Sequence, residues 1–254
     1  MMAMLEFYYD DSGTHADSDV VVWGGVAGHV HFMNELSAAW NAQLATPCEG
    51  RPPIKKFHSV DLMHGWGEFE GYSEPERNLT RRNFRKIILD AGLSVLSYGI
   101  AAKAWHEELN GVAKIALRSP EHTILSLAVA GGCEAAIKEK MPVAFVFDAG
   151  CATRTDIPLA VANGIELAKI DPDLVSSGIS PVMGNAGLQA ADLVAHETYR
   201  LFCDFLATGQ ANPEPHLARL RDGAHDFQAR WIGRNEITNM IAEFNAAMTL
   251  RRGE

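Results

Sequence analysis

The sequence predicts a single α/β domain in which helices flank a mixed β-sheet. Three observations indicate this fold. Two strand-like segments near the N-terminus are close enough to pair as a hairpin, and helix-like and strand-like segments alternate after them. The chain has 254 residues, of which 47% are hydrophobic and 21% are charged. It is therefore long enough for one large domain with a substantial core, and its composition is ordinary for a globular protein.

The first two apolar segments predict an N-terminal β-hairpin. Residues 4–9, MLEFYY, are rich in aromatic side chains, and residues 20–30, VVVWGGVAGHV, are rich in valine. Both compositions are typical of strands. Residues 33–45 follow as a helix, because their apolar side chains recur at helical spacing. Residues 46–72 contain several prolines and glycines, which predicts a loop-rich insertion, and loops of this length are often functional.

Helices and strands alternate beyond the insertion. Ser73 and Glu76 match a capping box, so we expect a helix that begins after Ser73 and ends before Gly92. Ser119 and Pro120 predict the start of a second long helix. The remaining patterns predict strands over residues 93–102, 142–148 and 174–182, and helices over residues 155–168, 188–207 and 236–248.

These elements predict one domain over residues 1–254. The insertion at 46–72 interrupts it, and residues 208–254 form a helical C-terminal extension with an extra helix. No run of 18 apolar residues occurs, so we expect no membrane span and no membrane partner. The first ten residues become acidic and do not resemble a signal peptide.

Charge and cysteine content narrow the functional classes. The formal net charge of −10 argues against broad, nonspecific adhesion to nucleic acid, because such adhesion depends on neutralising phosphates. A local basic face or a metal-filled acidic site is still compatible with this charge. Cys48, Cys133, Cys151 and Cys203 form no CxxC pair. They are therefore interpreted as reduced thiols, which predicts a cytoplasmic protein.

Three acidic residues lie at the ends or on the packed faces of predicted elements. Asp10 ends the first strand, with Asp11 in the turn after it, and Asp148 ends the strand at 142–148. Each of these acids, taken alone, is explained by a turn. Asp192 lies in the apolar helical segment LQAADLVA, where an aspartate has low helix propensity and is costly to bury without a partner. A solvated helix face is the alternative for Asp192.

The three acids together favour a metal site. Two strand ends and one helix face can meet above a sheet edge, where carboxylates repel one another unless a cation lies between them. Mg²⁺ and Mn²⁺ prefer oxygen ligands of this kind. Two such ions about 4 Å apart can promote phosphoryl transfer. We therefore expect Asp10, Asp148 and Asp192 to be both metal ligands and catalytic residues.

Four motifs resemble, in chain order, the signatures of the family called domain of unknown function 3800. They are YYDDSG at 8–13, FHSVDL at 57–62, VFDAG at 146–150 and GLQAADLVAHETYR at 187–200. The resemblance covers roughly residues 5–205 and implies a ribonuclease H-like fold. It also implies that Asp10, Asp148 and Asp192 are the acidic site residues, and that Ser12 and Gly13 shape the first turn. Further residues expected to support the acids are Ser180 and Gln189.

Two histidines and a basic helix face complete the candidate site. His58 lies in the insertion and His196 lies one turn after Asp192, so each is a candidate for proton transfer or substrate contact. The alternative is that they only order their surroundings. The last candidates are three arginines of one predicted helix, Arg77, Arg81 and Arg85. Their i, i+4 and i+8 spacing places them on one helix face, which either contacts phosphates or is simply solvated.

The sequence therefore predicts a Mg²⁺- or Mn²⁺-dependent nuclease or phosphodiesterase. Two alternatives stay open. One is a binding or regulatory protein on the same ribonuclease H-like fold, without catalysis. The other is a metal-dependent hydrolase of small phosphate esters, which the low basicity of the chain favours.

Overall fold

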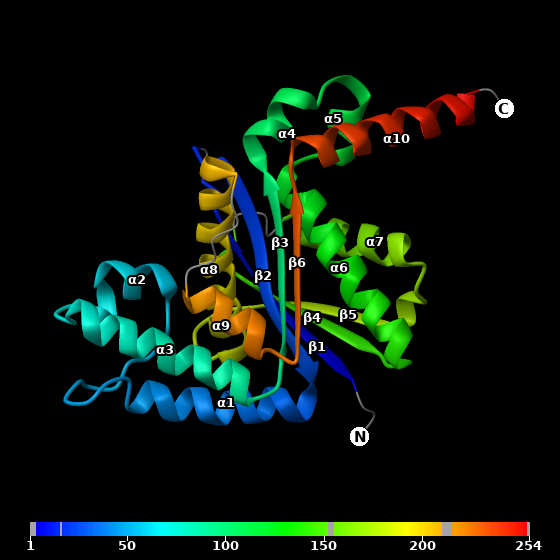
Figure 1. Ribbon diagram of the computed structural model, residues 1–254. Helices are drawn as coiled ribbons and strands as arrows, with labels where there is room; N and C mark the ends of the chain where they lie inside the picture. The colour runs from blue at the N-terminus through cyan, green and yellow to red at the C-terminus, as the bar shows by residue number, and fades with distance from the viewer. Residues whose placement is uncertain (1–3, 16, 152–154, 210–214, 253–254) are drawn as a thin grey trace.

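The structure, a computed structural model, describes residues 4–15, 17–151, 155–209 and 215–252. In this part of the chain a six-stranded sheet runs through the centre of the molecule, and helices cover both of its faces (Figure 1). The strands are β1 (Leu5–Ser12), β2 (Val20–His29), β3 (Ser94–Ala101), β4 (Val143–Asp148), β5 (Val175–Ser180) and β6 (Asp226–Ile232). Their order across the sheet is β5-β4-β1-β2-β3-β6. The predicted α/β class with a mixed sheet is confirmed.

The pairing of the central strands brings two of the candidate acids to the same level. β1 pairs with β2, and β2 with β3, in antiparallel fashion, whereas β4 and β5 extend the sheet in parallel from β1. The predicted N-terminal hairpin is therefore present, and Asp10 lies opposite Gly24. Parallel pairing aligns Tyr9 with Phe147. The next residue of each strand, Asp10 on β1 and Asp148 on β4, follows at the same level.

The helices form one layer on each face of the sheet. One layer contains α1 (Val30–Ala45), α3 (Glu74–Asp90) and α8 (Ala186–Thr208), which share one apolar cluster. The other layer contains α6 (Pro120–Glu139) and α7 (Ile157–Ala168), which pack on the aromatic side chains of β1 and β4 (Figure 1). The other described helices and short 3₁₀ turns are α2 (Ser59–His64), η1 (Gly67–Phe69), α4 (Ala102–Glu108), α5 (Gly111–Leu117), η2 (Pro172–Leu174), α9 (Pro215–Gly223) and α10 (Arg234–Arg252).

Helix α8 lies directly against the β1–β2 hairpin because glycine leaves room for it. A Cβ atom on Gly24 would lie only 2.3 Å from the Cα atom of Ala195. Any larger residue at this position would push the helix away from the strands. Asp192 precedes Ala195 by three residues and so shares its helix face. This close approach sets Asp192 over the part of the hairpin that carries Asp10.

The structure corrects the prediction that Asp10 ends the first strand. β1 continues to Ser12, with Asp11 opposite Trp23 and Ser12 opposite Val22. Pairing with β2 satisfies the backbone of these polar residues, so the strand extends beyond its apolar segment. The chain turns at Gly13, whose φ of 77° favours glycine.

The C-terminal region also differs from the prediction. Residues 208–254 were expected to form a helical extension, but β6 lies within them and pairs in parallel with β3 along Ser94–Ile100. The predicted C-terminal helix is present as α10. The 46–72 insertion is loop-rich as predicted, although α2 and η1 form short helical turns within it.

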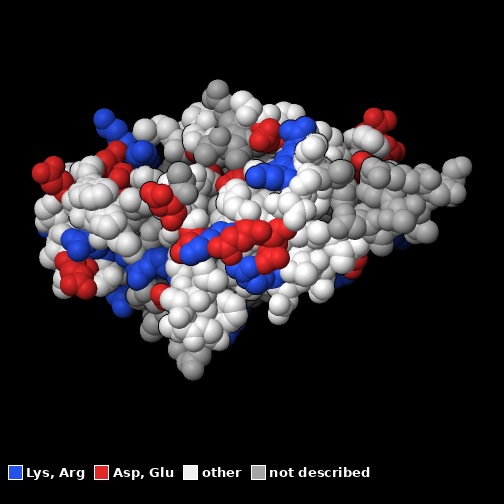
Figure 2. Space-filling model, turned by 90° about the horizontal axis from the view of Figure 1, so that it is seen from above, with Lys and Arg blue, Asp and Glu red and all other residues white. Residues whose placement is uncertain are grey.

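Charged side chains do not form a single-sign surface on the face of the molecule that carries α4 and α10. Figure 2 shows basic and acidic groups intermixed there. Arg234 on α10, for example, forms ion pairs with both Glu107 and Glu108 of α4. Among the described helices, none combines the length and apolar character needed to cross a bilayer.

Candidate functional site

Asp10 and Asp148 face the α8 side of the sheet because of strand alternation. Their preceding residues, Tyr9 and Phe147, are 0% exposed and belong to the apolar cluster under α6 and α7. Successive side chains of a strand point to opposite faces. Asp10 and Asp148 therefore point away from this cluster, towards α8.

Asp192 enters the same region from α8. Its side chain is buried, with 8% of the residue exposed. The Oδ2 atom accepts a hydrogen bond from the backbone N–H of Ser59 at 2.7 Å. This bond ties the insertion to the helix, so the start of α2 lies beside the acid.

The three acids interact electrostatically. Burial raises the pKa of Asp10 well above its usual value, and the charges of Asp192, Asp11 and Asp148 raise it further, while the N–H of Asp11 lowers it. Burial also raises the pKa of Asp192, but His58 and the Ser59 N–H favour its ionised form. Burial and the neighbouring charges therefore favour the protonated form of Asp10 when no cation is present.

Asp148 is held in place by two backbone donors. The N–H of Val182 donates to Oδ1 at 3.0 Å, and the N–H of Gly150 donates to Oδ2 at 2.9 Å. Ser180 aligns with Asp148 across β4 and β5, and its carbonyl oxygen accepts a hydrogen bond from the N–H of Ala149 at 2.9 Å. Ser180 therefore supports the end of β4 through its backbone.

Gln189 connects the two loops that contact the acids. Its Oε1 accepts hydrogen bonds from Trp40 Nε1 at 3.0 Å and from the Phe57 N–H at 2.7 Å, and its Nε2 donates to the Val182 carbonyl at 3.2 Å. Phe57 lies two residues before Ser59, which bonds Asp192, and Val182 bonds Asp148. The predicted supporting role of Gln189 thus has a specific geometry.

Ser12 and Gly13 lie where the hairpin turns. Ser12 is the last residue of β1 and is half-buried. A Cβ atom on Gly13 would lie 2.2 Å from the Val20 carbonyl oxygen and 2.5 Å from the ring of Tyr199. Glycine is therefore required both by its positive φ and by the close approach of α8.

The two candidate histidines lie on the insertion and on α8. His58 Nδ1 and Asp61 Oδ2 are 3.0 Å apart. Burial lowers the pKa of His196 to about 4, and the positive charges of Arg200, Arg81, His58 and His64 contribute to the shift. His196 is therefore neutral at neutral pH and a weak base, so its ring is suited to hydrogen bonding rather than to proton transfer.

The basic stripe is shorter than the sequence predicted. Arg85 is 2% exposed, and its guanidinium donates to Glu197 Oε1 at 2.8 Å. It therefore anchors α3 to α8 instead of contacting substrate, because this position of α3 faces α8 rather than solvent. Arg77 donates to the Tyr72 carbonyl at 2.8 Å, and Arg81 lies close enough to His196 to lower its pKa.

Sequence reasoning missed two residues near this site. Arg200 lies one turn beyond His196 and contributes positive charge there; its place at the end of the GLQAADLVAHETYR motif is a signal that points to it. Trp66, in the insertion, is 57% exposed, which is unusual for so large an apolar side chain.

The acids lie on one face, but they are not assembled as a metal cage. In the described part of the chain, no three or more His, Cys, Asp or Glu side chains are arranged so that they could hold a metal ion. The donor set nevertheless suits a cation, because burial raises the pKa of Asp10 and the charges of Asp192, Asp11 and Asp148 raise it further. Ligation by all three acids would require their side chains to converge.

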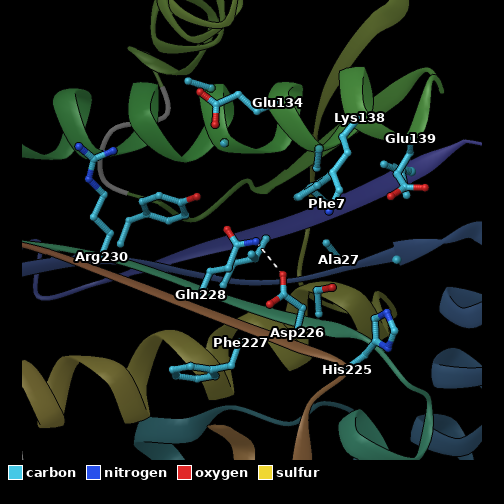
Figure 3. A pocket seen from close by; sticks show the side chains of 18 of the residues that line it. Phe7, Ala27, Glu134, Lys138, Glu139, His225, Asp226, Phe227, Gln228 and Arg230 are labelled. Atoms are coloured by element: carbon cyan, nitrogen blue, oxygen red, sulfur yellow. Dashed lines mark hydrogen bonds between the residues drawn. The ribbon is translucent and has the colours of Figure 1, made fainter.

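A large cavity lies away from these acids. It has a volume of about 1160 Å³ and opens on the α6 side of the sheet, between α6, β3 and β6 (Figure 3). Glu134 and Lys138 of α6 lie across from Gln228 and Arg230 of β6 (Figure 3). None of the candidate site residues lines it, so its shape carries no information about the acidic site.

Comparison with known proteins does not identify the chain. No protein-family model matches it, and no curated protein is significantly similar to it. The resemblance to the domain of unknown function 3800 family therefore stays a prediction from four motifs.

Proposed function

We propose that this protein is a divalent-metal-dependent phosphodiesterase that cleaves nucleic acid, with Asp10, Asp148 and Asp192 as the ligands of Mg²⁺ or Mn²⁺. The observation that carries the proposal is the shared face of these acids, whose repulsion and burial raise the pKa of Asp10. A bound cation would remove this repulsion. The mixed sheet, with β1 and β4 parallel at its centre, is compatible with a ribonuclease H-like fold.

The surrounding residues support phosphate chemistry. A bound cation would supply positive charge to a phosphoryl group. Arg81 and Arg200 place further positive charge beside His196, and cationic side chains of this kind stabilise phosphate. His196, neutral at neutral pH, offers a ring nitrogen that can accept a hydrogen bond near that charge. His58 lies 3.0 Å from Asp61 Oδ2, and its charge also favours the ionised form of Asp192. It therefore interacts with an acid of the insertion and with an acid of α8.

Two observations favour the alternatives. The acids are not assembled as a metal cage in the described residues, which favours a binding or regulatory protein without catalysis. The burial of Arg85 and the net charge of −10 leave little basic surface for a long polyanion, which favours a hydrolase of small phosphate esters.

Cleavage assays separate the three proposals. Purified protein is incubated with Mg²⁺ or Mn²⁺ and with single- and double-stranded DNA, RNA, hybrid duplexes and bis(p-nitrophenyl) phosphate. We expect cleavage of nucleic acid that Asp148→Asn and Asp192→Asn abolish, because the amide keeps the shape of the acid and loses its charge. Asp90→Asn, which changes an exposed acid on α3, is the control and should retain full activity.

The other outcomes are equally informative. Hydrolysis of the small diester alone would favour the phosphate-ester hydrolase. Binding of nucleic acid without any cleavage would favour the binding protein. Cleavage that survives both Asp→Asn substitutions would place the chemistry elsewhere and contradict the proposal.

A further inference from the structure

An exposed aromatic pair lies in the insertion, on the segment that also bonds Asp192 through Ser59. The rings of His64 and Trp66 are stacked, with centroids 4.5 Å apart and an interplanar angle of 22°. Trp66 is 57% exposed, whereas Trp23, Trp40 and Trp105 are at most 1% exposed. Packing with His64 covers only part of the indole, so the pair presents an aromatic surface to solvent.

The backbone fixes this pair in place. The helix α2 ends at Gly65, which adopts a left-handed conformation with φ of 69°. The next residue, Trp66, donates its N–H to the Asp61 carbonyl at 2.9 Å. The Asp61 side chain in turn lies 3.0 Å from His58 Nδ1. Trp66 is therefore held by the same short segment that contacts Asp192.

Positively charged side chains lie near the aromatic pair. His64 and Arg81 both contribute to the lowered pKa of His196, which follows Asp192 by one helical turn. A Cβ atom on Gly65 would lie 3.2 Å from Arg77 Nη1, so a second arginine lies beside the pair. The aromatic pair thus lies beside Arg77, and the segment that carries it also bonds Asp192 through Ser59.

We propose that Trp66 and His64 form a stacking platform for an unpaired nucleobase, so that the substrate is single-stranded nucleic acid. This inference rests on the proposed phosphodiesterase function and specifies its substrate. Aromatic side chains stack on single-stranded bases, and cationic side chains beside them contact the backbone. A base inside a duplex is covered on both faces by its neighbours, so it cannot stack on an exposed indole. The nearby arginines favour a phosphate-linked ring over a neutral sugar.

Binding without metal tests the platform separately from catalysis. The affinity of a fluorescein-labelled ten-residue oligothymidylate is measured by anisotropy in EDTA at one fixed salt concentration, since salt changes such affinities. We expect Trp66→Ala to weaken binding roughly 5- to 150-fold, the range that loss of one stacked base implies. Trp66→Phe should retain part of the affinity. The matched control is Ile137→Ala, which truncates an exposed apolar side chain on α6 and should leave binding unchanged.

An abasic strand of the same length identifies the stacked group. Trp66→Ala should change its affinity less than twofold, because it carries no base. An equal loss for both strands, a normal affinity of Trp66→Ala, or no binding of either strand by the unmodified protein would overturn the platform. Trp66-dependent binding without cleavage in Mn²⁺ would keep the platform and reject the phosphodiesterase. Cleavage that is unaffected by Trp66→Ala would keep the phosphodiesterase and reject the platform.

Discussion

Replacement of Gln189 by leucine tests whether one side chain holds together the loops around the acids. Gln189 is 1% exposed and accepts hydrogen bonds from Trp40 Nε1 and the Phe57 N–H. Trp40 and Phe57 are both 0% exposed, so water cannot replace the lost acceptor. A buried donor left without a partner costs about 1–3 kcal/mol. Gln189→Leu should therefore lower the free energy of unfolding by roughly 2–6 kcal/mol for the two donors.

Urea denaturation with linear extrapolation measures this loss. In a Trp40→Phe background one of the two donors is absent, so Gln189→Leu should cost about 1–3 kcal/mol less there. Gln228→Leu is the control, because Gln228 is exposed and its side-chain amide donates a hydrogen bond to the nearby, exposed Asp226. A loss below about 1 kcal/mol for Gln189→Leu, or no coupling to Trp40, would refute the reasoning.

Three further predictions concern charge. The folded-state pKa of Asp10 is raised, so ionisation of Asp10 destabilises the folded protein as pH rises. Without metal, Asp10→Asn should therefore melt at a higher temperature than the unmodified protein at pH 8. This difference in melting temperature should vanish below about pH 4, where Asp10 is protonated in both the folded and the unfolded state. Arg85→Met removes the buried ion pair with Glu197 and should lower the unfolding free energy in urea by about 3–5 kcal/mol, and Arg85→Met/Glu197→Leu should cost less than Arg85→Met alone. The imidazole of His196 should titrate in NMR near pH 4; a midpoint above pH 6 would contradict its described surroundings.

Local signals in the sequence predicted most of the fold. The capping box at Ser73 and Glu76 is present, and Ser119 caps α6 by accepting a hydrogen bond from the His122 N–H. These motifs predict helix starts reliably because their side chains accept hydrogen bonds from backbone N–H groups only a few residues away, independently of tertiary contacts. The apolar patterns at residues 4–9 and 142–148 likewise predicted β1 and β4, although β1 continues two residues beyond Asp10.

The features that sequence reasoning missed depend on distant partners. β6 has a short and mostly exposed segment, and it becomes a strand by pairing with β3, more than 100 residues earlier in the chain. Arg85 occupies a helix face that looks solvated in the sequence, but Glu197 on α8 makes burial of its charge tolerable. Neither partner can be identified from local composition, because β-pairing and ion pairing across the core are set by the whole fold.

Sequence reasoning proposed the candidate residues, but it did not predict the contacts that surround them. The apolar neighbours of Asp192 indicated that its carboxylate serves a purpose other than solvation, and the structure buries it beside Ser59. The role of Gln189 as a link between two loops required knowledge of Trp40 and Val182, which lie on other elements. The spacing of residues within one helix predicts which of them share a face, but it does not predict which other elements contact that face.

The most direct test of the metal-site proposal is the anomalous difference density of manganese in crystals soaked in Mn²⁺. We predict at least one peak about 2.0–2.4 Å from carboxylate oxygens of Asp10, Asp148 and Asp192, a separation typical of hard divalent cations. The peak should disappear in crystals of Asp148→Asn. An absence of manganese at this face, or a peak held only by other residues, would contradict the proposal that these three acids form a metal site.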